Sequence, residues 1–474
     1  MPHPTPEQDV LGGLPPVRPI SAAQVADRIA GGPRLVVLDD DPTGTQTVAD
    51  VPVLTSWAVD DLRWALRQPG TAFFVLTNTR SLGPADAAER NRQVVRALRA
   101  AAEAEGGVRY VLASRGDSTL RGHFPLETDV LAEELGGADG TILVPAYVEA
   151  GRLTVGGTHW MRVDGGLLPV GGSEFARDAT FGYRSSALPD WVEEKTAGRV
   201  RAAEVLTITL DDLRVGGPTH TADLLRTLHD GATAVVDAVR DDDLRVLALA
   251  LAEAEEAGSR LLYRVGPSFV RARAGQAGRP PLTPDTLPRP AGAAPHGLIA
   301  IGSHVSLTTR QLARLRQRGG IAEFELEVGT LLDAERRDTH VADVAAAAAA
   351  ALEHADAVIH TSRTLVTAVD ADASLDIARR VSAALVETVR QVNAARRPAF
   401  VVAKGGITSS DIATEGLGID RAWARGTLLP GIVSLWQPVA GPAANTPYVV
   451  FAGNVGTDDA LADAVDLLRS AAPC

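Results

Sequence analysis

The stretch LVVLDDDPTGTQT, residues 35–47, decides the fold predicted for this chain of 474 residues. Four apolar residues are typical of a buried strand, and three aspartates follow before a turn of Pro42, Thr43 and Gly44. Adjacent carboxylates repel one another unless a cation lies among them. The stretch therefore predicts a strand that ends in a site. That site could hold a metal, a phosphate bound through a metal, a sugar hydroxyl, or a phosphoryl group on Asp39 itself.

Strand and helix patterns alternate beyond this stretch. SAAQVADRIA (21–30) predicts a helix that begins after Ser21, and a longer helical pattern runs over 85–105. Alternation of this kind favours an α/β fold with a largely parallel sheet, whose ligands bind at the carboxyl ends of the strands. Further strands are predicted at 72–79, 109–114 and 140–146. The residues expected at or just beyond strand ends are Asp39, Asn78, Arg115 and Pro145.

A second α/β unit is predicted after a segment rich in proline and glycine. Residues 276–297 lack an apolar period, which is typical of a linker or a long exposed loop. Strand–turn–helix patterns then resume at 298–312 and again at 399–413. We therefore expect two domains, each a largely parallel sheet flanked by helices, with a cleft between the domains. The predicted parts are a flexible tail at 1–18, one domain at 19–275, the linker at 276–297 and a second domain at 298–474.

Composition narrows the class of protein. A net charge of −13 and a pI near 5.3 argue against broad binding to nucleic acid or to anionic membranes. The one cysteine, Cys474, excludes an intramolecular disulfide and a cysteine metal site. No basic segment followed by an apolar one opens the chain, and no apolar run reaches about 18 residues. We expect a cytoplasmic protein; its oligomeric state is open, with a homodimer as one option.

The opening stretch also fits a phosphatase. An apolar strand followed by Asp39-x-Asp41-x-Thr43 resembles the first motif of haloacid dehalogenase-like phosphotransferases, whose first aspartate attacks phosphorus. That chemistry needs a lysine beside the nucleophile. The chain has only Lys195, in a polar stretch, and Lys404, beyond the predicted linker. Neither lysine is an obvious partner for Asp39, but a phosphatase with Asp39 as nucleophile stays open as an alternative.

A dense group of polar side chains follows the strand predicted at 109–114. Arginine presents a planar fork that matches a carboxylate, and serine and threonine hydroxyls match the hydroxyls of a sugar. An arginine-rich turn capped by Ser118 and Thr119 is the alternative. The group consists of Arg115, Asp117, Ser118, Thr119 and Arg121. Arg80 lies just beyond another predicted strand. Arg152 follows a strand and a glycine, where a structural turn is an equal alternative.

Three glycine-containing turns follow apolar strands in the second unit. They are GSHVSLTT (302–309), AKGGITSSDIA (403–413) and FAGNVGTDDAL (451–461). Glycine lets a backbone approach a phosphate closely, and a following helix offers unpaired N–H groups. None of the three has the Walker or the Rossmann spacing. Each alone could be an ordinary tight turn, but together they favour a cradle for the phosphates of a nucleotide.

These motifs together resemble those of the four-carbon acid sugar kinases. The resemblance runs from about residue 35 to about 465, and DSTLRG (117–122) matches the family's hexapeptide residue for residue. The other similar elements are DDDPTGT (39–45), TNTRS (77–81), PAYVEAGRLT (145–154), GSHVSLTTRQ (302–311), GGITSSDI (405–412) and AGNVG (452–456). The chain departs from the family's pattern at Asp39, His123, Ile407 and Asn454, and in an extended segment at 173–196. These departures leave the particular substrate open.

The resemblance implies ATP-dependent phosphorylation of a four-carbon sugar acid of the threonate, erythronate or oxo-tetronate type. It implies a sugar-acid-binding domain at 19–275 and a nucleotide-binding domain at 298–474. Asp41 or Asp117 would be the general base, with Asp41 favoured, and Asp39 and Asp40 would carry Mg²⁺ through waters. The substrate would contact Asp40, Thr43, Gly44, Arg80, Ser118, Thr119, Arg121 and Arg152. ATP would contact Ser303, Lys404, Gly405, Gly406, Ile407, Thr408, Gly453 and Gly456.

A protein that binds the acid without catalysis is the remaining alternative. The departures at Ile407 and Asn454 lie in the predicted nucleotide loops, so a sugar-acid sensor built on a kinase-like fold also fits the sequence.

Overall fold

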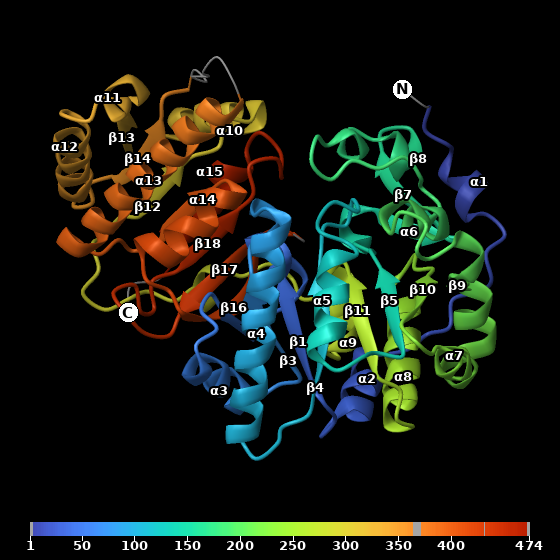
Figure 1. Cartoon of the computed structure of the whole chain (residues 1–474). Helices are drawn as coiled ribbons and strands as arrows, with labels where there is room; N and C mark the ends of the chain where they lie inside the picture. The colour runs from blue at the N-terminus through green and yellow to red at the C-terminus, as the bar shows by residue number, and fades with distance from the viewer. Residues whose placement is uncertain (1–2, 364–370, 431, 472–474) are drawn as a thin grey trace. The chain divides into compact units, whose positions relative to one another are not determined.

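The computed structural model of the chain describes residues 3–363, 371–430 and 432–471 (Figure 1). The chain divides into two compact units, one with residues up to Val48 and Ser56–Gly278, the other with Ala49–Thr55 and the chain from Arg279 onward. Among the helices of the described residues, none has the length and apolar character needed to cross a bilayer. Cys474 lies outside the described residues.

The N-terminal unit is built on a parallel sheet. Its strands follow the order β3 (Ala72–Leu76), β1 (Arg34–Asp39), β4 (Tyr110–Arg115), β11 (Leu261–Val265), β5 (Gly140–Val144), β10 (Ala232–Val236) and β9 (Leu206–Ile208). Each neighbouring pair in this order runs parallel. The strands are apolar and almost wholly buried, as expected of a sheet that helices cover on both faces.

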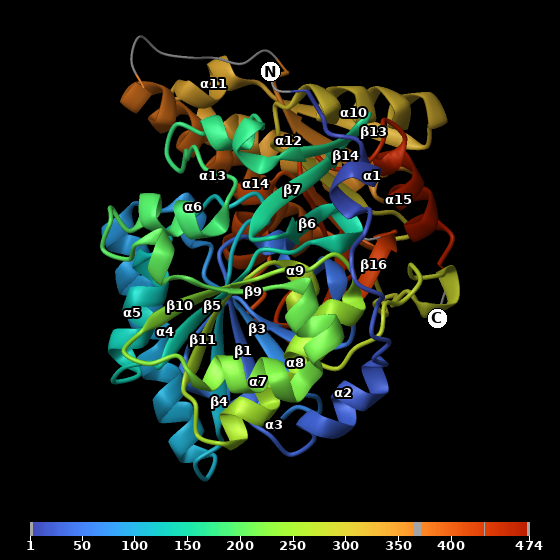
Figure 2. The same ribbon diagram turned by 90° about the vertical axis from the view of Figure 1, so that its right-hand side faces the viewer.

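Helices form a layer on each face of this sheet (Figure 2). One layer packs α3 (Val59–Arg67), α4 (Pro84–Ala104) and α5 (Leu126–Glu134) together. The other contains α2 (Ala22–Ile29), α7 (Gly217–Arg226), α8 (Asp241–Glu256) and α9 (Pro267–Arg273). The cap predicted for α2 is confirmed, because the Ser21 side chain accepts a hydrogen bond from the Gln24 amide in a capping box.

A small antiparallel sheet and a short helix complete the N-terminal unit. The sheet contains β6 (Arg152–Val155), β7 (Thr158–Val163) and β8 (Gly166–Pro169), and the helix is α6 (Leu188–Lys195). Trp191 of α6 stacks on Phe124 with ring centroids 4.8 Å apart. This contact anchors the extended segment 173–196 beside the loop that follows β4.

The C-terminal unit has a mixed sheet. The order is β13 (Ile321–Leu326), β14 (Asp356–Thr361), β12 (Leu298–Ile301), β15 (Val401–Lys404), β18 (Tyr448–Phe451), β17 (Ile432–Pro438), β16 (Arg421–Leu429) and β2 (Val51–Leu54). Strands from β13 to β18 pair in parallel, whereas β17, β16 and β2 pair antiparallel.

Helices also cover this second sheet. α10 (Ser306–Arg318) packs with α15 (Ala460–Arg469), and α12 (Arg337–Ala351) packs with α13 (Ala371–Ala395). Two shorter helices, α11 (Val328–Leu332) and α14 (Gly406–Asp411), contact α13. The predicted α/β class, with a largely parallel sheet flanked by helices in each part of the chain, is confirmed.

Three segments differ from the patterns read in the sequence. The predicted loose tail contains the helix α1 (Glu7–Leu11), and Thr5 pairs with Leu167 of β8. The predicted linker contributes to the C-terminal unit, where the Leu282 amide donates to the Thr427 carbonyl at 2.8 Å. The strand β2 comes from the N-terminal part of the sequence, yet it pairs with β16.

We expect Val53→Ala to weaken the C-terminal sheet. Val53 is 1% exposed and lies opposite Ala422 of β16. Loss of its two methyl groups should lower the free energy of unfolding by about 2 kcal/mol. Hydrogen exchange should become faster at the β16 amides. Faster exchange confined to β1 and β3 would contradict this assignment, and Val59→Ala, at a site 39% exposed, is the matched control.

Candidate active site

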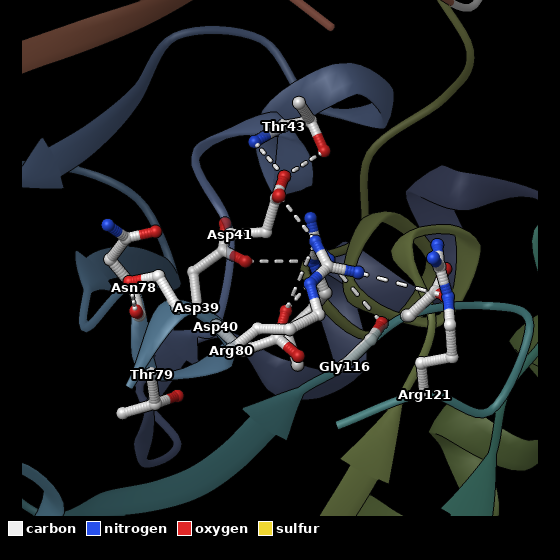
Figure 3. Close-up of polar contacts among 12 residues, drawn as sticks. Asp39, Asp40, Asp41, Thr43, Asn78, Thr79, Arg80, Gly116 and Arg121 are labelled. Carbon is white, nitrogen blue, oxygen red and sulfur yellow. Dashed lines mark hydrogen bonds and ion pairs between the residues drawn. The ribbon is translucent and has the colours of Figure 1, made fainter. Parts of the chain in front are cut away.

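Parallel strands bring the predicted N-terminal residues to one edge of the sheet (Figure 3). The register places Asp39, at the end of β1, opposite Leu76 of β3 on one side and Arg115 of β4 on the other. The polar loops that follow these strands therefore start from the same edge. Asn78 has a left-handed conformation, with φ at 51°, and turns the chain so that the Arg80 amide donates to the Asp40 carbonyl at 3.3 Å.

Arg115 lies between two buried aspartates. Its Nε is 2.9 Å from Asp39 Oδ1, and its guanidinium donates to Asp40 Oδ1 at 3.4 Å. Both aspartates are 2% exposed. Gly44 packs directly against this contact, since a Cβ there would lie 1.9 Å from Asp39 Oδ2 and 2.4 Å from Arg115 Nε. The glycine is thus required by the buried ion pair.

Asp41 begins the next turn and also binds Arg80. Its side chain caps the 3₁₀ helix η1 (Pro42–Thr47), because Oδ1 accepts the Thr43 amide at 2.8 Å and the Thr43 hydroxyl. Its other oxygen, Oδ2, forms an ion pair with Arg80. Arg80 also lies 3.9 Å from Asp40 and 3.7 Å from Asp117. Arg80 therefore joins the loops that follow β1, β3 and β4.

Asp117 is the acidic centre of the DSTLRG loop. Its Oδ2 accepts hydrogen bonds from Arg121 Nε at 2.6 Å and from the Thr119 hydroxyl. Ser118 is 8% exposed, and its carbonyl accepts a hydrogen bond from His159 Nε2 at 2.8 Å. Burial lowers the pKa of His159 to about 4, so the ring is neutral and keeps this loop in place.

The four aspartates have different proton affinities. Burial raises the pKa of Asp39 to about 8 and that of Asp40 to about 6, although Arg115 opposes both shifts. Burial also disfavours ionisation of Asp41 and Asp117. For Asp41, Arg80, Arg115 and Thr43 outweigh it and lower the pKa. For Asp117, Arg80 and Arg121 lower the pKa to about 2. At neutral pH, Asp41 and Asp117 are therefore ionised, whereas Asp39 is largely protonated.

Arg152 differs from the other arginines of this group. Its guanidinium donates to the Ala150 carbonyl, but its buried Nε has no hydrogen-bond partner among the described residues. Burial lowers its pKa, and the nearby negative charge of Asp117 partly opposes this. Within the described part of the chain, Arg152 forms no ion pair with a carboxylate. The side chain is half-buried, and among the described residues Asp117 acts on its charge without an ion pair.

Two further charged residues support the site, and the sequence did not point to them. Arg264 of β11 donates to Glu127 and, at 2.7 Å, to the Ser114 hydroxyl. Glu127 also accepts the Thr79 hydroxyl at 2.5 Å. A Cβ at Gly116 would lie 2.3 Å from Arg264, so the loop after β4 packs onto this guanidinium. An arginine within the apolar run LLYRV was the signal that could have revealed it.

The predicted glycine turns converge within the C-terminal unit. They follow β12, β15 and β18, which are neighbouring parallel strands. A Cβ at Gly302 would lie 2.3 Å from the Thr408 hydroxyl, and one at Gly453 would lie 2.4 Å from the Ser303 hydroxyl. Gly405 has a φ of 132° and packs against both Thr408 and Ser303. We predicted that these glycines allow a ligand to approach the backbone. They also allow the loops to pack closely on one another.

Contacts from α10 hold the third loop. The Thr308 hydroxyl donates to the Gly453 carbonyl at 2.9 Å, and Gln311 Nε2 donates to the Thr457 carbonyl at 2.8 Å. Gly456 has a φ of 86°, and a Cβ there would lie 2.5 Å from Ala460 Cβ. This loop therefore has little freedom for larger residues.

Lys404 points into the protein. Its side chain is fully buried, donates to the Ala452 carbonyl at 2.6 Å and lies 3.7 Å from the centre of the Phe451 ring. Burial lowers its pKa to about 7. Gly406 and Ile407 open α14, and Ile407 is 60% exposed.

The aspartates at 39 and 40 do not fit a Mg²⁺ site. Mg²⁺ prefers free anionic oxygens, whereas these carboxyls are buried, contact Arg115 and have raised pKa values. Across the described residues, no three histidine, cysteine or acidic side chains come together in an arrangement that could hold a metal ion.

Comparison with known proteins covers both units. The family of sugar-binding N-terminal domains matches residues 35–273, and the family of nucleotide-binding C-terminal domains matches residues 298–461. A D-erythronate kinase of Heliobacterium modesticaldum is 23% identical over 460 residues, which cover 92% of this chain and 97% of that protein. A D-threonate kinase of Bordetella bronchiseptica is 28% identical over 459 residues, which cover 93% and 98%.

A solved structure shares the fold. A protein of Salmonella typhimurium LT2 superposes with a TM-score of 0.66 at 19% identity, over 91% of this chain and 98% of that chain.

We expect Gly44→Ala to disrupt the cluster of charges. The new methyl group would occupy the space of Asp39 and Arg115, so the buried pair must separate. The melting temperature should fall by several degrees, because one unmatched buried charge costs about 3–5 kcal/mol. Gly83→Ala is the matched control, since a Cβ there meets no atom within 4 Å. Equal melting temperatures for both variants would contradict this role of Gly44.

We expect Asp39 to make stability depend on pH. The folded state holds its proton up to about pH 8, whereas the unfolded chain releases it near 3.8, so rising pH lowers the free energy of unfolding between these values. Relative to Asp39→Asn, the wild type should lose stability from about pH 5 to about pH 8, by at most about 1.4 kcal/mol per pH unit. Urea unfolding at constant ionic strength measures this difference, and parallel curves would contradict it.

Proposed function

This chain belongs to the four-carbon acid sugar kinase family, and we propose that it transfers the γ-phosphoryl group of ATP to a hydroxyl of a four-carbon sugar acid. The threonate, erythronate and oxo-tetronate types are the candidate acids. The two kinases similar over more than nine-tenths of the chain support this reaction class, as do the matches to a sugar-binding and a nucleotide-binding domain.

The observation that carries the proposal is the guanidinium of Arg152, which forms no ion pair with a carboxylate of the described residues. A half-buried cation that is not paired with a carboxylate costs free energy, and a carboxylate from a ligand recovers that cost through charge-assisted hydrogen bonds. Protonation of Asp39 removes one more negative charge from the cluster. The site therefore attracts a small anion even though the whole chain is acidic.

The other arginines differ in how many N–H groups remain to bind the substrate. Arg80 is held by Asp41, and Arg121 by Asp117, so both are already neutralised in part. The Arg121 side chain keeps 25% exposure and can give its remaining N–H groups to the same carboxylate. Ser118 and Thr119 are the hydroxyls that remain to bind the sugar chain.

Asp117 is the better placed proton acceptor. Both oxygens of Asp41 are engaged, Oδ1 by Thr43 and Oδ2 by Arg80. The short contacts described for Asp117 fall on Oδ2, which leaves Oδ1 for the hydroxyl of the acid. Its low pKa makes it a weak base, but phosphoryl transfer through a loose transition state needs orientation of the hydroxyl more than strong basicity.

The glycine turns of the C-terminal unit are the proposed phosphate contacts. Backbone N–H groups at Gly406 and Gly453 would meet the phosphates, with the Ser303 and Thr408 hydroxyls beside them. The Gly405 amide already donates to the Phe451 carbonyl at 2.8 Å, so Gly405 would only allow close approach. We propose a supporting role for Lys404, which holds the end of β15 to Ala452. Mg²⁺ would arrive with the nucleotide phosphates, because Asp39 and Asp40 do not suit it.

The surroundings of Asp39 speak against the phosphatase alternative. A nucleophilic carboxylate must be ionised and must reach phosphorus. Asp39 is 2% exposed, contacts Arg115 and has a raised pKa. The sensor alternative uses the same acid site as the kinase, so turnover distinguishes the two.

A panel of four-carbon sugar acids tests the proposal. With Mg-ATP, at least one acid should be phosphorylated, and each ligand should raise the melting temperature. Arg152→Gln should raise KM for that acid by about 10- to 100-fold and leave the affinity for ATP unchanged, because a charged hydrogen bond is lost. Arg199→Gln, at an exposed pair with Asp129, is the matched control.

Other outcomes have clear meanings. Binding of an acid without turnover would favour the sensor. Turnover without nucleotide and a phosphoryl group on Asp39 would favour the phosphatase. An unchanged KM in Arg152→Gln would contradict the role of this arginine.

A further inference from the structure

The extended segment around residues 175–183, here called the clasp, surrounds Arg121. The Phe175 ring lies under the guanidinium, with 4.9 Å between Arg121 Cζ and the ring centre. Asp178 Oδ2 lies 3.6 Å from one terminal nitrogen of Arg121. Together with the bond from Arg121 Nε to Asp117, these contacts hold the guanidinium at its face, its end and its inner edge.

The clasp is itself fixed by local hydrogen bonds. Asp178 Oδ1 accepts the amides of Thr180 at 2.9 Å and Phe181 at 3.0 Å. The Tyr183 amide donates to the Ala176 carbonyl at 3.0 Å, which closes the loop. Asp178 therefore cannot follow Arg121 freely, since its second oxygen anchors the turn that carries it.

The clasp is also tied to the substrate loop. The Tyr183 hydroxyl donates to the Thr119 carbonyl at 2.6 Å. The Phe181 ring meets the His123 ring edge-on at 5.0 Å, and His123 Nε2 donates to the Leu82 carbonyl at 3.0 Å. One segment thus connects the loop of Arg121 to the loop of Arg80.

The charge of Asp178 is available to Arg121. Partial burial opposes ionisation, but the amides of Phe181 and Thr180, together with Arg121, lower the pKa of Asp178. A fixed anion at one terminal nitrogen and a ring over one face restrict the rotamers of a long side chain. Restricting a binding group before the ligand arrives reduces the entropy lost on binding.

We propose that Phe175 and Asp178 are positioning residues that hold Arg121 ready for the carboxylate of the sugar acid. This inference rests on the proposed function. Neither residue touches the reacting atoms, so their effect falls on binding of the acid and not on phosphoryl transfer.

Two conservative variants test the inference. Asp178→Asn keeps the oxygen that accepts the Thr180 and Phe181 amides but removes the charge. Phe175→Leu keeps the apolar bulk but removes the aromatic face. Each should raise KM for the acid about 3- to 10-fold, leave kcat within about twofold, and leave KM for ATP unchanged. Asp190→Asn, at an exposed position of α6 outside the clasp, is the control.

A double-mutant cycle separates positioning from general support of the fold. If Asp178 acts through Arg121, then Asp178→Asn should have no further effect on acid affinity in an Arg121→Ala background. Equal effects in both backgrounds would overturn the inference. So would a lower KM in Asp178→Asn, because Asp178 would then compete with the substrate carboxylate.

The proposed function can fail separately. If the wild type phosphorylates no four-carbon acid, the kinase proposal fails and the inference falls with it. If the wild type turns over an acid normally and both clasp variants keep its KM, only the inference is overturned.

Discussion

The buried contact of Arg115 with Asp39 and Asp40 is the constraint on which the rest of the N-terminal unit depends. A guanidinium and two carboxyl groups leave water there, and close contact among them compensates for their lost hydration. Pairing requires β1 and β4 to be parallel neighbours in one register, with Asp39 opposite Arg115. It also requires a glycine at position 44. The adjacency of β1 and β4, the glycine of the turn and the position of the site are therefore all tied to one interaction.

Much of the fold and part of the site could be predicted from local sequence. Alternating patterns indicated the α/β class, and polar residues after apolar strands indicated the edge where Asp39 and Arg115 meet. The pairing of Arg80 with Asp41 and the support from Arg264 could not be predicted. Both depend on which strands are neighbours, and β11 reaches the side of β4 from about 150 residues further along the chain. The position of β2 could not be predicted for the same reason, because its four residues do not indicate their distant partner β16.

A glycine in a turn can have either of two structural reasons, and the sequence alone does not distinguish them. A missing side chain allows a ligand to approach, but it also allows one loop to pack on another. In the C-terminal unit, one loop packs on another, because Gly302 and Gly453 leave room for the hydroxyls of Thr408 and Ser303. Packing between loops is compatible with approach of a ligand, since loops that are held together present their N–H groups in a fixed arrangement. The buried Lys404 side chain also holds these loops in place, through its hydrogen bond to the Ala452 carbonyl.

The charge of the chain and the charge of the site have opposite implications. A net charge of −13 predicts repulsion of large anions such as nucleic acid, because that effect sums over the whole surface. A small acid instead senses the few groups within a Debye length of about 8 Å. Among the described residues at this edge of the sheet, most guanidinium groups form ion pairs with the protein's own carboxylates, whereas that of Arg152 does not. The anion that such a site can hold therefore depends on how few positive charges are left unmatched, and not on how many arginines the motifs contain.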